Sequence, residues 1–280
     1  MKRRSLPPPT GFTSTAGTRA TLPELWQIRW LVFQLIRRDL TVRYRQTSLG
    51  WLWAVLNPAL NLAMYYTVFG IMVRMAAPEY PAPYALVLLS GLVLWMLFAG
   101  TVNTVSEVLL TNLHLIQKIW FPRTALTLAA TGVSLTDFIL ALLLLGMMLP
   151  LSCHPWPLSH LPVLLLCGGL TALAGWGLGS LLAVLRLRFR DIRHLIPLLM
   201  QALFYLSPVV WTPGLLPARW QSLVAFSPLN GLISLFRYAL LGGTPPSGSM
   251  MVTAVAGPLL LAALGSHLFS RYEAQVVDRE

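Results

Sequence analysis

Charged side chains are scarce in this sequence of 280 residues. Only 10% of the residues are Asp, Glu, Lys or Arg, against about 25% in an average soluble domain, and 56% are hydrophobic. This composition excludes an ordinary soluble domain and predicts an integral membrane protein. The net charge of +11 does not indicate nucleic acid as a partner, because the chain has too little polar surface to present a basic binding face.

Motifs for catalysis and metal binding are also missing from the sequence. No GxxxxGK[ST] stretch offers a P-loop for ATP, and neither GxSxG nor HExxH is present. Cys153 and Cys167 give neither a disulfide framework nor a CxxC pair. His154 and His160 lie near Cys153 in a proline-rich stretch, which favours a solvated loop over a metal site. We therefore expect no metal and no catalytic residue in this chain.

The N-terminus is basic but lacks the apolar core of a signal peptide. Three prolines follow the first charges in "MKRRSLPPPT", so residues 1–20 are predicted to be a flexible cytoplasmic tail. Residues 271–280 are predicted to be a second cytoplasmic tail.

Long apolar stretches make up most of the remaining chain, and a membrane span needs about 20 such residues. Each is expected to be a helix, because a span must satisfy its backbone polar groups internally. The fold class is therefore an all-α integral membrane protein with six transmembrane helices. The six stretches are 51–73, 84–106, 124–149, 161–185, 195–212 and 250–270. Within the fourth, Gly175 and Gly179 have GxxxG spacing, which predicts close helix packing.

Residues 213–249 fit this six-span pattern less well than the rest of the chain. They hold two short apolar pieces, broken near Ser227-Pro228 and Asn230-Gly231. Each piece is too short to cross a bilayer, which favours a re-entrant or interfacial outer hairpin between spans five and six. A crossing here would instead place the C-terminus outside.

Basic residues cluster in alternate loops. With both termini assigned to the cytoplasm, all but three of the 20 Lys and Arg residues lie inside, and the three outside are Arg74, Arg219 and Arg237. This asymmetry fits the positive-inside rule and explains the net charge without a basic binding site.

Residues 21–48 precede the first span and have the pattern of an amphipathic helix. Thr21 and Glu24 have capping-box spacing, and Pro23 falls in the first turn. Apolar residues recur at helical spacing opposite a polar, basic face, as in a helix that lies in the membrane interface. A plain anchor for the first span explains the same pattern. The apolar positions are Leu25, Ile28, Val32, Leu35 and Leu40.

Asp137 is the only carboxylate well inside a predicted span. Intramembrane acids face the protein interior and are candidates for a functional role. A structural hydrogen-bond acceptor is an equally good interpretation. Nine acidic residues scattered along the chain argue against an intramembrane glycosyl- or acyltransferase, which would need several acids or a His at one depth.

Five segments, in order, resemble the ABC-2 type permeases that export bacterial cell-surface polysaccharides, with the O-antigen and teichoic-acid exporters the nearest group. The resemblance as a whole covers residues 24 to about 270. They are "RRDLTVRYRQTSLGWLWAVLNP", "NLHLIQKIWFPRTAL", "LRFRDIRHLIP", "LFYLSPVVWTP" and "AFSPLNGLISLFRYALLG". On this resemblance, residues 49–270 are a six-span ABC-2 transmembrane domain. An ABC-2 drug or natural-product exporter is the alternative.

The resemblance implies a homodimer in the bacterial cytoplasmic membrane, bound to two copies of a separate ATPase subunit. ATP and Mg would then be held by that partner, and this chain would be a permease subunit without enzymatic activity. The substrate would be a lipid-linked polysaccharide that passes outward between the protomers.

Three groups of residues are candidates for this transport. Arginine forks suit a lipid phosphate, although the positive-inside rule explains the same charges. Aromatic rings stack on sugars, although an interfacial aromatic belt explains some of them. The headgroup candidates are Arg38, Arg43 and Arg45. The sugar-pathway candidates are Tyr65, Tyr66, Phe69, Trp95, Phe98, Phe204, Tyr205 and Trp211. The ATPase-coupling candidates are Phe121, Pro122, Arg123, Arg190 and Asp191, with a plain turn as the alternative for the first three.

Overall fold

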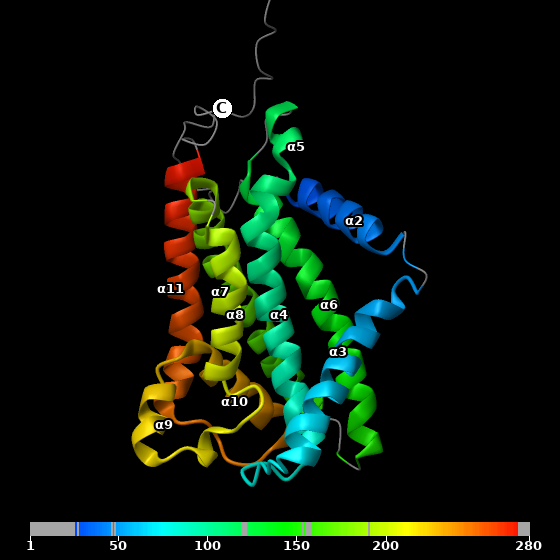
Figure 1. Ribbon diagram of the computed structural model, residues 1–280, viewed down its shortest axis with the longest axis vertical. Coiled ribbons are helices and arrows are strands. Elements are labelled where there is room, and N and C mark those ends of the chain that lie inside the picture. The colour runs from blue at the N-terminus through cyan, green and yellow to red at the C-terminus, as the bar shows by residue number, and fades with distance from the viewer. Residues whose placement is uncertain are drawn as a thin grey trace, which may run out of the picture.

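A computed structural model describes residues 26, 28–45, 47, 49–118, 122–152, 154, 158–189 and 191–273. Within these ranges the chain is helical and contains no strand, which confirms the all-α membrane class (Figure 1). The expected tail 1–20 and most of the tail 271–280 lie outside the described residues.

The bundle is built around α4 (Tyr84–Thr111), which is apolar on every side and largely buried. It packs against α6 (Thr124–Leu151) and α7 (Leu161–Arg188), and α7 also packs along α11 (Gly248–Glu273). Short helices join these elements: α5 (Leu113–Lys118) before α6, and the 3-10 turn η2 (Leu158–His160) before α7.

Glycines let α7 approach its neighbours closely. A Cβ added at Gly175 would lie 2.9 Å from Thr101 Cβ, and one at Gly179 would lie 2.8 Å from Val105 Cβ, both on α4. On another face of α7, the backbone of Gly177 touches the backbone of α11 at Gly265. The close packing predicted from the GxxxG spacing is therefore confirmed, and its partner is α4.

The first expected span consists of α3 (Leu52–Tyr65) followed by a π-helical segment, η1 (Tyr66–Met72). Only 6% of its most apolar window is buried within this chain, although the helix is apolar enough to cross a membrane. It lies at the edge of the bundle in Figure 1, where it contacts α4 and α6.

The expected interfacial helix is α2 (Arg29–Arg45), which lies across the upper part of the bundle rather than along it (Figure 1). Ile28 and Leu35 are buried against α6, in a cluster with Leu126, Ala129 and Ala130. Trp26 and Trp30 are exposed. The predicted start at Thr21 lies outside the described residues.

The fifth expected span, 195–212, is helical only as far as Leu206. Helix α8 (Ile192–Leu206) has 15 residues, or about 22 Å at 1.5 Å per residue, which is less than the hydrocarbon thickness. Ser207 is extended because the following Pro208 disfavours the helical conformation of the residue before it. In the part of the chain that the structure describes, five helices are long and apolar enough to cross a membrane: Leu52–Met72, Tyr84–Thr111, Thr124–Leu151, Leu158–Arg188 and Gly248–Tyr272.

Short elements close the end of the bundle opposite α2. They are η3 (Pro213–Leu215), α9 (Ala218–Val224) and α10 (Pro228–Leu241). The chain breaks at Ser227-Pro228 as expected, but α10 runs through Asn230-Gly231 without interruption. Asn230 instead donates a 2.7 Å hydrogen bond to the Val224 carbonyl and so ties α10 to α9.

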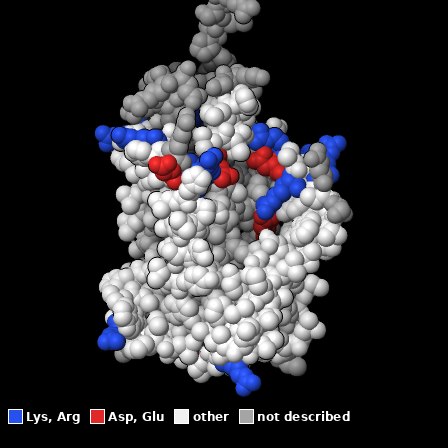
Figure 2. All heavy atoms as spheres, viewed as in Figure 1, with Lys and Arg blue, Asp and Glu red and all other residues white. Residues whose placement is uncertain are grey.

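Arg237 corrects the charge count, because it is buried within the protein and not in an exposed outer loop. Its side chain is 0% exposed and donates to the carbonyls of Val87 (3.1 Å), Val209 (2.7 Å) and Trp211 (3.3 Å). It therefore joins α10, α4 and the segment after α8. The remaining surface charges gather in a band at the α2 end, separated by a broad uncharged belt from a few basic groups at the other end (Figure 2).

Candidate functional site

A cavity of about 480 Å³ opens between the α2–α3 arm and the bundle. The walls come from α2, α3, α4, α6 and α8, so residues far apart in the sequence meet there. The space-filling view shows charged atoms at the rim of a hollow on this side (Figure 2). Its polar lining residues are Arg43, Tyr44, Asn57, Asn61, Ser134 and Asp137, and its aromatic ones are Tyr44, Trp53, Tyr65, Trp95, Phe138 and Phe204.

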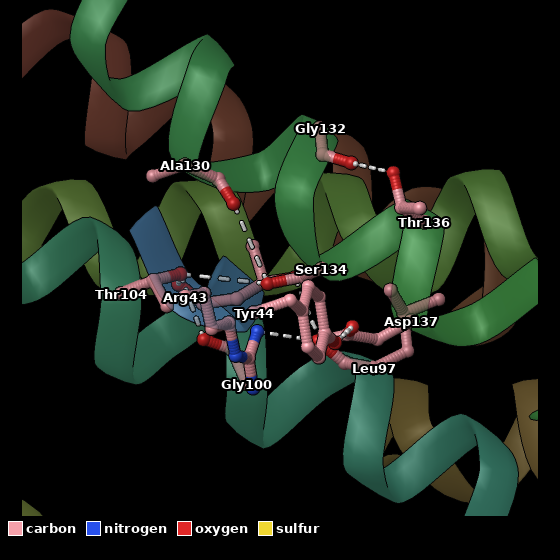
Figure 3. A network of polar contacts seen from close by, with 11 residues as sticks. Arg43, Tyr44, Leu97, Gly100, Thr104, Ala130, Gly132, Ser134, Thr136 and Asp137 are labelled. Atoms are coloured by element: carbon pink, nitrogen blue, oxygen red, sulfur yellow. Dashed lines mark hydrogen bonds and ion pairs between the residues drawn. The ribbon is translucent and has the colours of Figure 1, made fainter. Parts of the chain in front are cut away.

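Asp137 is held by two consecutive residues at the end of α2. Arg43 Nη1 lies 2.6 Å from Asp137 Oδ2, and the Tyr44 hydroxyl donates a 2.8 Å hydrogen bond to Asp137 Oδ1 (Figure 3). The acid that looked isolated in the sequence therefore has a basic partner. Both ionic side chains keep access to solvent, with 48% of Arg43 and 30% of Asp137 exposed.

Tyr44 supports this ion pair from the buried side. Its ring stacks on Trp51 with centroids 4.5 Å apart, and the residue is 7% exposed. Burial, together with the hydrogen bond to Asp137, raises the pKa of Tyr44 to about 12. The phenol therefore stays protonated at neutral pH and acts as a hydrogen-bond donor to the carboxylate.

Small polar side chains continue from the ion pair between α4 and α6. Thr104 Oγ1 and Ser134 Oγ are 3.4 Å apart, and Thr104 also bonds back to the Gly100 carbonyl (Figure 3). Thr136 bonds to the Gly132 carbonyl on its own helix. Ser134 and Gly100 belong to the cavity lining, so this polar contact reaches the cavity wall there.

Of the three headgroup candidates, the structure brings only Arg43 to the cavity. Arg38 pairs with Asp39 at 2.8 Å and donates a 2.9 Å hydrogen bond to Asn112 Oδ1 at the end of α4. Arg45 is exposed and does not line the cavity.

The aromatic candidates divide into three environments. Tyr65, Trp95 and Phe204 line the cavity, and Phe204 lies 5.0 Å from Tyr65 and 5.3 Å from Trp95 between ring centroids. Phe98 is 2% exposed and belongs to the core, and Phe69 packs beside Tyr65. On the protomer surface, Tyr66 is 37% and Tyr205 56% exposed, while Trp211 bonds to the Tyr205 carbonyl at 3.0 Å.

The chain matches a family model described as ABC-2 type transporter over residues 31–241, which is more than half its length. It belongs to the ABC-2 type transporter family. The O-antigen export system permease protein RfbA of Myxococcus xanthus is 28% identical over 256 residues, covering 89% of this chain and 95% of that protein. RfbA of Klebsiella pneumoniae is 24% identical over 248 residues, and the polysialic acid transport protein KpsM of Escherichia coli is 21% identical over 245 residues. These alignments cover 89% and 87% of this chain and 94% of each relative.

The ATPase-coupling candidates that the structure of this ABC-2 chain describes lie at one end of the bundle. Helix α6 begins directly after Pro122 and Arg123, and α8 begins directly after Asp191. Both starts lie at the end that carries α5 (Figure 1). Phe121 and Arg190 lie outside the described residues.

Two asparagines line the 480 Å³ cavity of this ABC-2 chain and were not predicted from the sequence. Asn57 and Asn61 line it from α3, and Asn61 Nδ2 donates a 2.9 Å hydrogen bond to Asn57 Oδ1. Their spacing in the sequence could have indicated this site, because two amides four residues apart in an apolar span lie on one face of the helix. Amides in a span are as informative as the acid at Asp137.

Proposed function

We propose that this chain is the transmembrane permease subunit of an ABC transporter that exports a lipid-linked, O-antigen-like polysaccharide across the bacterial cytoplasmic membrane. The observation that carries the proposal is the similarity to O-antigen export permeases over nearly the full length of both chains. The 480 Å³ cavity adds physical support, because it combines an arginine with aromatic rings and amides.

The phosphate between lipid and sugar is received by Arg43 in this proposal. A guanidinium binds phosphate through two parallel charge-assisted hydrogen bonds, and Arg43 is exposed enough to accept such a ligand. Asp137 holds the arginine in place while no substrate is present. Arg38 and Arg45 flank it on the same helix and add positive potential at the interface.

The transport pathway runs between two protomers of a homodimer. Tyr66 and Tyr205 lie exposed on the protomer surface, where rings that contact a passing sugar chain belong. The proposed aromatic set also includes Tyr65, Trp95 and Phe204, which line the cavity, and Phe69, Phe98 and Trp211, which do not. Stacking on ring faces tolerates sliding, because it depends on the sugar C–H faces and not on fixed hydrogen bonds.

Energy comes from two copies of a separate ATPase subunit, which hold ATP and Mg. Two segments of this chain receive the motion of the ATPase. One comprises Phe121, Pro122 and Arg123, and the other comprises Arg190 and Asp191. Both loops precede helices of the bundle, so a push on either is transmitted along α6 or α8.

Both termini lie in the cytoplasm, and α8 with residues 207–212 serves as the fifth of six membrane segments. The hairpin of α9 and α10 then returns to the outer side before α11. The band of charge at the α2 end supports this orientation (Figure 2).

Deletion of the gene in its source bacterium tests the function. We expect surface polysaccharide to disappear and lipid-linked polymer to accumulate inside the cell, with recovery when the gene is supplied on a plasmid. Unchanged surface polysaccharide together with greater sensitivity to a drug would favour the drug-exporter alternative and refute the proposal.

A further inference from the structure

A second cavity, of about 430 Å³, lies at the opposite end of the bundle from the arginine-rich band. It forms where the loop before α4 meets η3, α9, α10 and the start of α11. The size is within the range of small-molecule sites. Its lining comprises Glu79, Tyr80, Pro213, Gly214, Gln221, Ser222, Ala225, Ser234, Thr244, Pro245, Pro246, Ser247, Ser249 and Met250.

The walls of this outer cavity are fixed by buried polar contacts. Arg237, just beneath it, binds three carbonyls from α4 and from the segment after α8. The Thr244 N–H donates a 3.3 Å hydrogen bond to the Glu79 carbonyl. This bond joins the segment between α10 and α11 to the loop before α4. The site is therefore held in shape before any ligand arrives.

Glu79 supplies the only charge among the described lining residues. Its carboxylate lies directly against Gly214, where an added Cβ would collide with Oε1. Burial raises the pKa of Glu79 above its ordinary value, against the opposing effects of the Gly214 backbone and the Arg237 cation. A carboxylate with incomplete solvation gains from further hydrogen-bond donors.

Ser234 has hydrogen-bonding capacity left for a ligand in the cavity. Its residue is 4% exposed, and Oγ lies within reach of the Tyr80 hydroxyl, also in the lining, without a well-aligned hydrogen bond to any described residue. Buried hydroxyls are nearly always well paired, so one that lines a cavity without a well-aligned partner favours an occupant with a polar group.

The lining chemistry selects the class of that occupant. One carboxylate, several hydroxyls and an amide can bind neighbouring hydroxyl groups, and the prolines and Tyr80 offer apolar faces for C–H groups. No Lys or Arg is among the described lining residues, so an anionic ligand has no counter-charge there. A lipid tail does not match so many polar groups.

We propose that the outer cavity binds one or two uncharged sugar residues of the exported polymer, with Glu79 accepting hydrogen bonds from adjacent hydroxyls and Ser234 pairing with another. This assignment rests on the proposed export function. A sugar held at the outer end resists backward movement of the chain between ATP cycles.

Thiol protection in the purified permease–ATPase complex tests the site. Ser249→Cys places an exposed thiol at the cavity rim in a Cys153→Ser background, and the remaining Cys167 is fully buried. The probe is the bacterium's own surface polysaccharide, freed from its lipid by mild acid. We expect it to slow maleimide reaction at position 249 several-fold, and polyethylene glycol of equal mass to leave the rate unchanged.

Two variants and one control position make the test specific. Glu79→Gln should raise the polysaccharide concentration needed for half-maximal protection about tenfold. The reason is that hydrogen bonds to a charged group are stronger than those to a neutral one. Ser234→Ala should weaken it while leaving the melting temperature nearly unchanged, because Oγ makes no well-aligned hydrogen bond that the substitution would remove. A thiol at Arg219→Cys, exposed on α9 outside the cavity, should react equally with and without polysaccharide.

The outcomes separate this site from the export function. If polysaccharide does not protect position 249 in a complex that restores surface polymer to the deletion strain, the cavity assignment is wrong and the export function stands. Equal protection by polyethylene glycol, or full protection in both Glu79→Gln and Ser234→Ala, also overturns the assignment. Unchanged surface polysaccharide after gene deletion overturns the export function instead.

Discussion

Arg43 and Asp137 form an ion pair with Nη1 and Oδ2 2.6 Å apart, although 94 residues separate them in the chain. The pair connects the end of helix α2 to the middle of α6, at the larger cavity (Figure 3). It places Arg43 against the only carboxylate among the described residues that line that cavity. In the proposed function, an anionic group that binds Arg43 competes with Asp137 for the charge of its guanidinium.

The first prediction concerns the guanidinium group of Arg43. Arg43→Lys keeps the positive charge but loses the two-pronged fork, so insertion should be normal while polymer export falls markedly. Arg45→Lys is the matched control, because Arg45 lies on the same helix but does not line the cavity. Surface polysaccharide and membrane protein level are measured together. Equal export by Arg43→Lys and wild type would leave these arginines an orienting role only.

Asp137 gives the second prediction. The pair is partly exposed, so a double-mutant cycle of Arg43→Gln and Asp137→Asn should show a coupling of about 0.5–1 kcal/mol in unfolding free energy. Export should fall more than this small loss explains if Asp137 positions the arginine. Wild-type export by Asp137→Asn at an equal protein level would make the carboxylate structural.

Close packing of α7 gives the third prediction. Gly175→Ala with Gly179→Ala should lower the melting temperature by several degrees, because both new methyl groups meet α4 at distances below 3 Å. Gly169→Ala on the same helix has no neighbour within 4 Å. It should be neutral or stabilising by up to about 1 kcal/mol through helix propensity. Thermal unfolding in detergent measures both, and equal melting temperatures would contradict the packing.

The structure agrees with the sequence where the encoding is local. The apolar runs at 84–106 and 124–149 became α4 and α6, because their length and composition leave few alternatives. The helix expected over 195–212 ends at Leu206 because Pro208 follows Ser207, and the apolar composition of the stretch hid that signal. The Arg43–Asp137 pair could not be predicted, since its partners meet only once α2 folds across α6. Arg237 was assigned to an outer loop because its carbonyl acceptors come from two segments that are distant in the sequence, α4 and the segment after α8.

Topology is the fourth prediction. The proposed six segments place Gly248 outside and Gln275 in the cytoplasm. In a Cys153→Ser background, Gly248→Cys should react with a membrane-impermeant thiol reagent in intact cells, and Gln275→Cys should react only after lysis. Labelling of position 275 in intact cells would refute cytoplasmic placement of the C-terminus.

Coupling to the ATPase is the fifth prediction. Phe121→Ala with Arg123→Ala removes an apolar and a charged contact from the loop before α6. The permease should remain in the membrane while export is lost and co-purification of the ATPase weakens. Arg219→Ala, at the opposite end, should retain both properties. Normal export by the double variant would show that this loop is a plain turn.

Reconstitution tests the central claim most directly. The permease and its ATPase are placed in vesicles loaded with the bacterium's lipid-linked polysaccharide, and polymer is detected on the opposite membrane face with and without ATP. The account predicts ATP-dependent appearance of polymer that falls sharply in Arg43→Lys and persists in Arg45→Lys. Vesicles that move a small drug on ATP addition but never this polymer would contradict it.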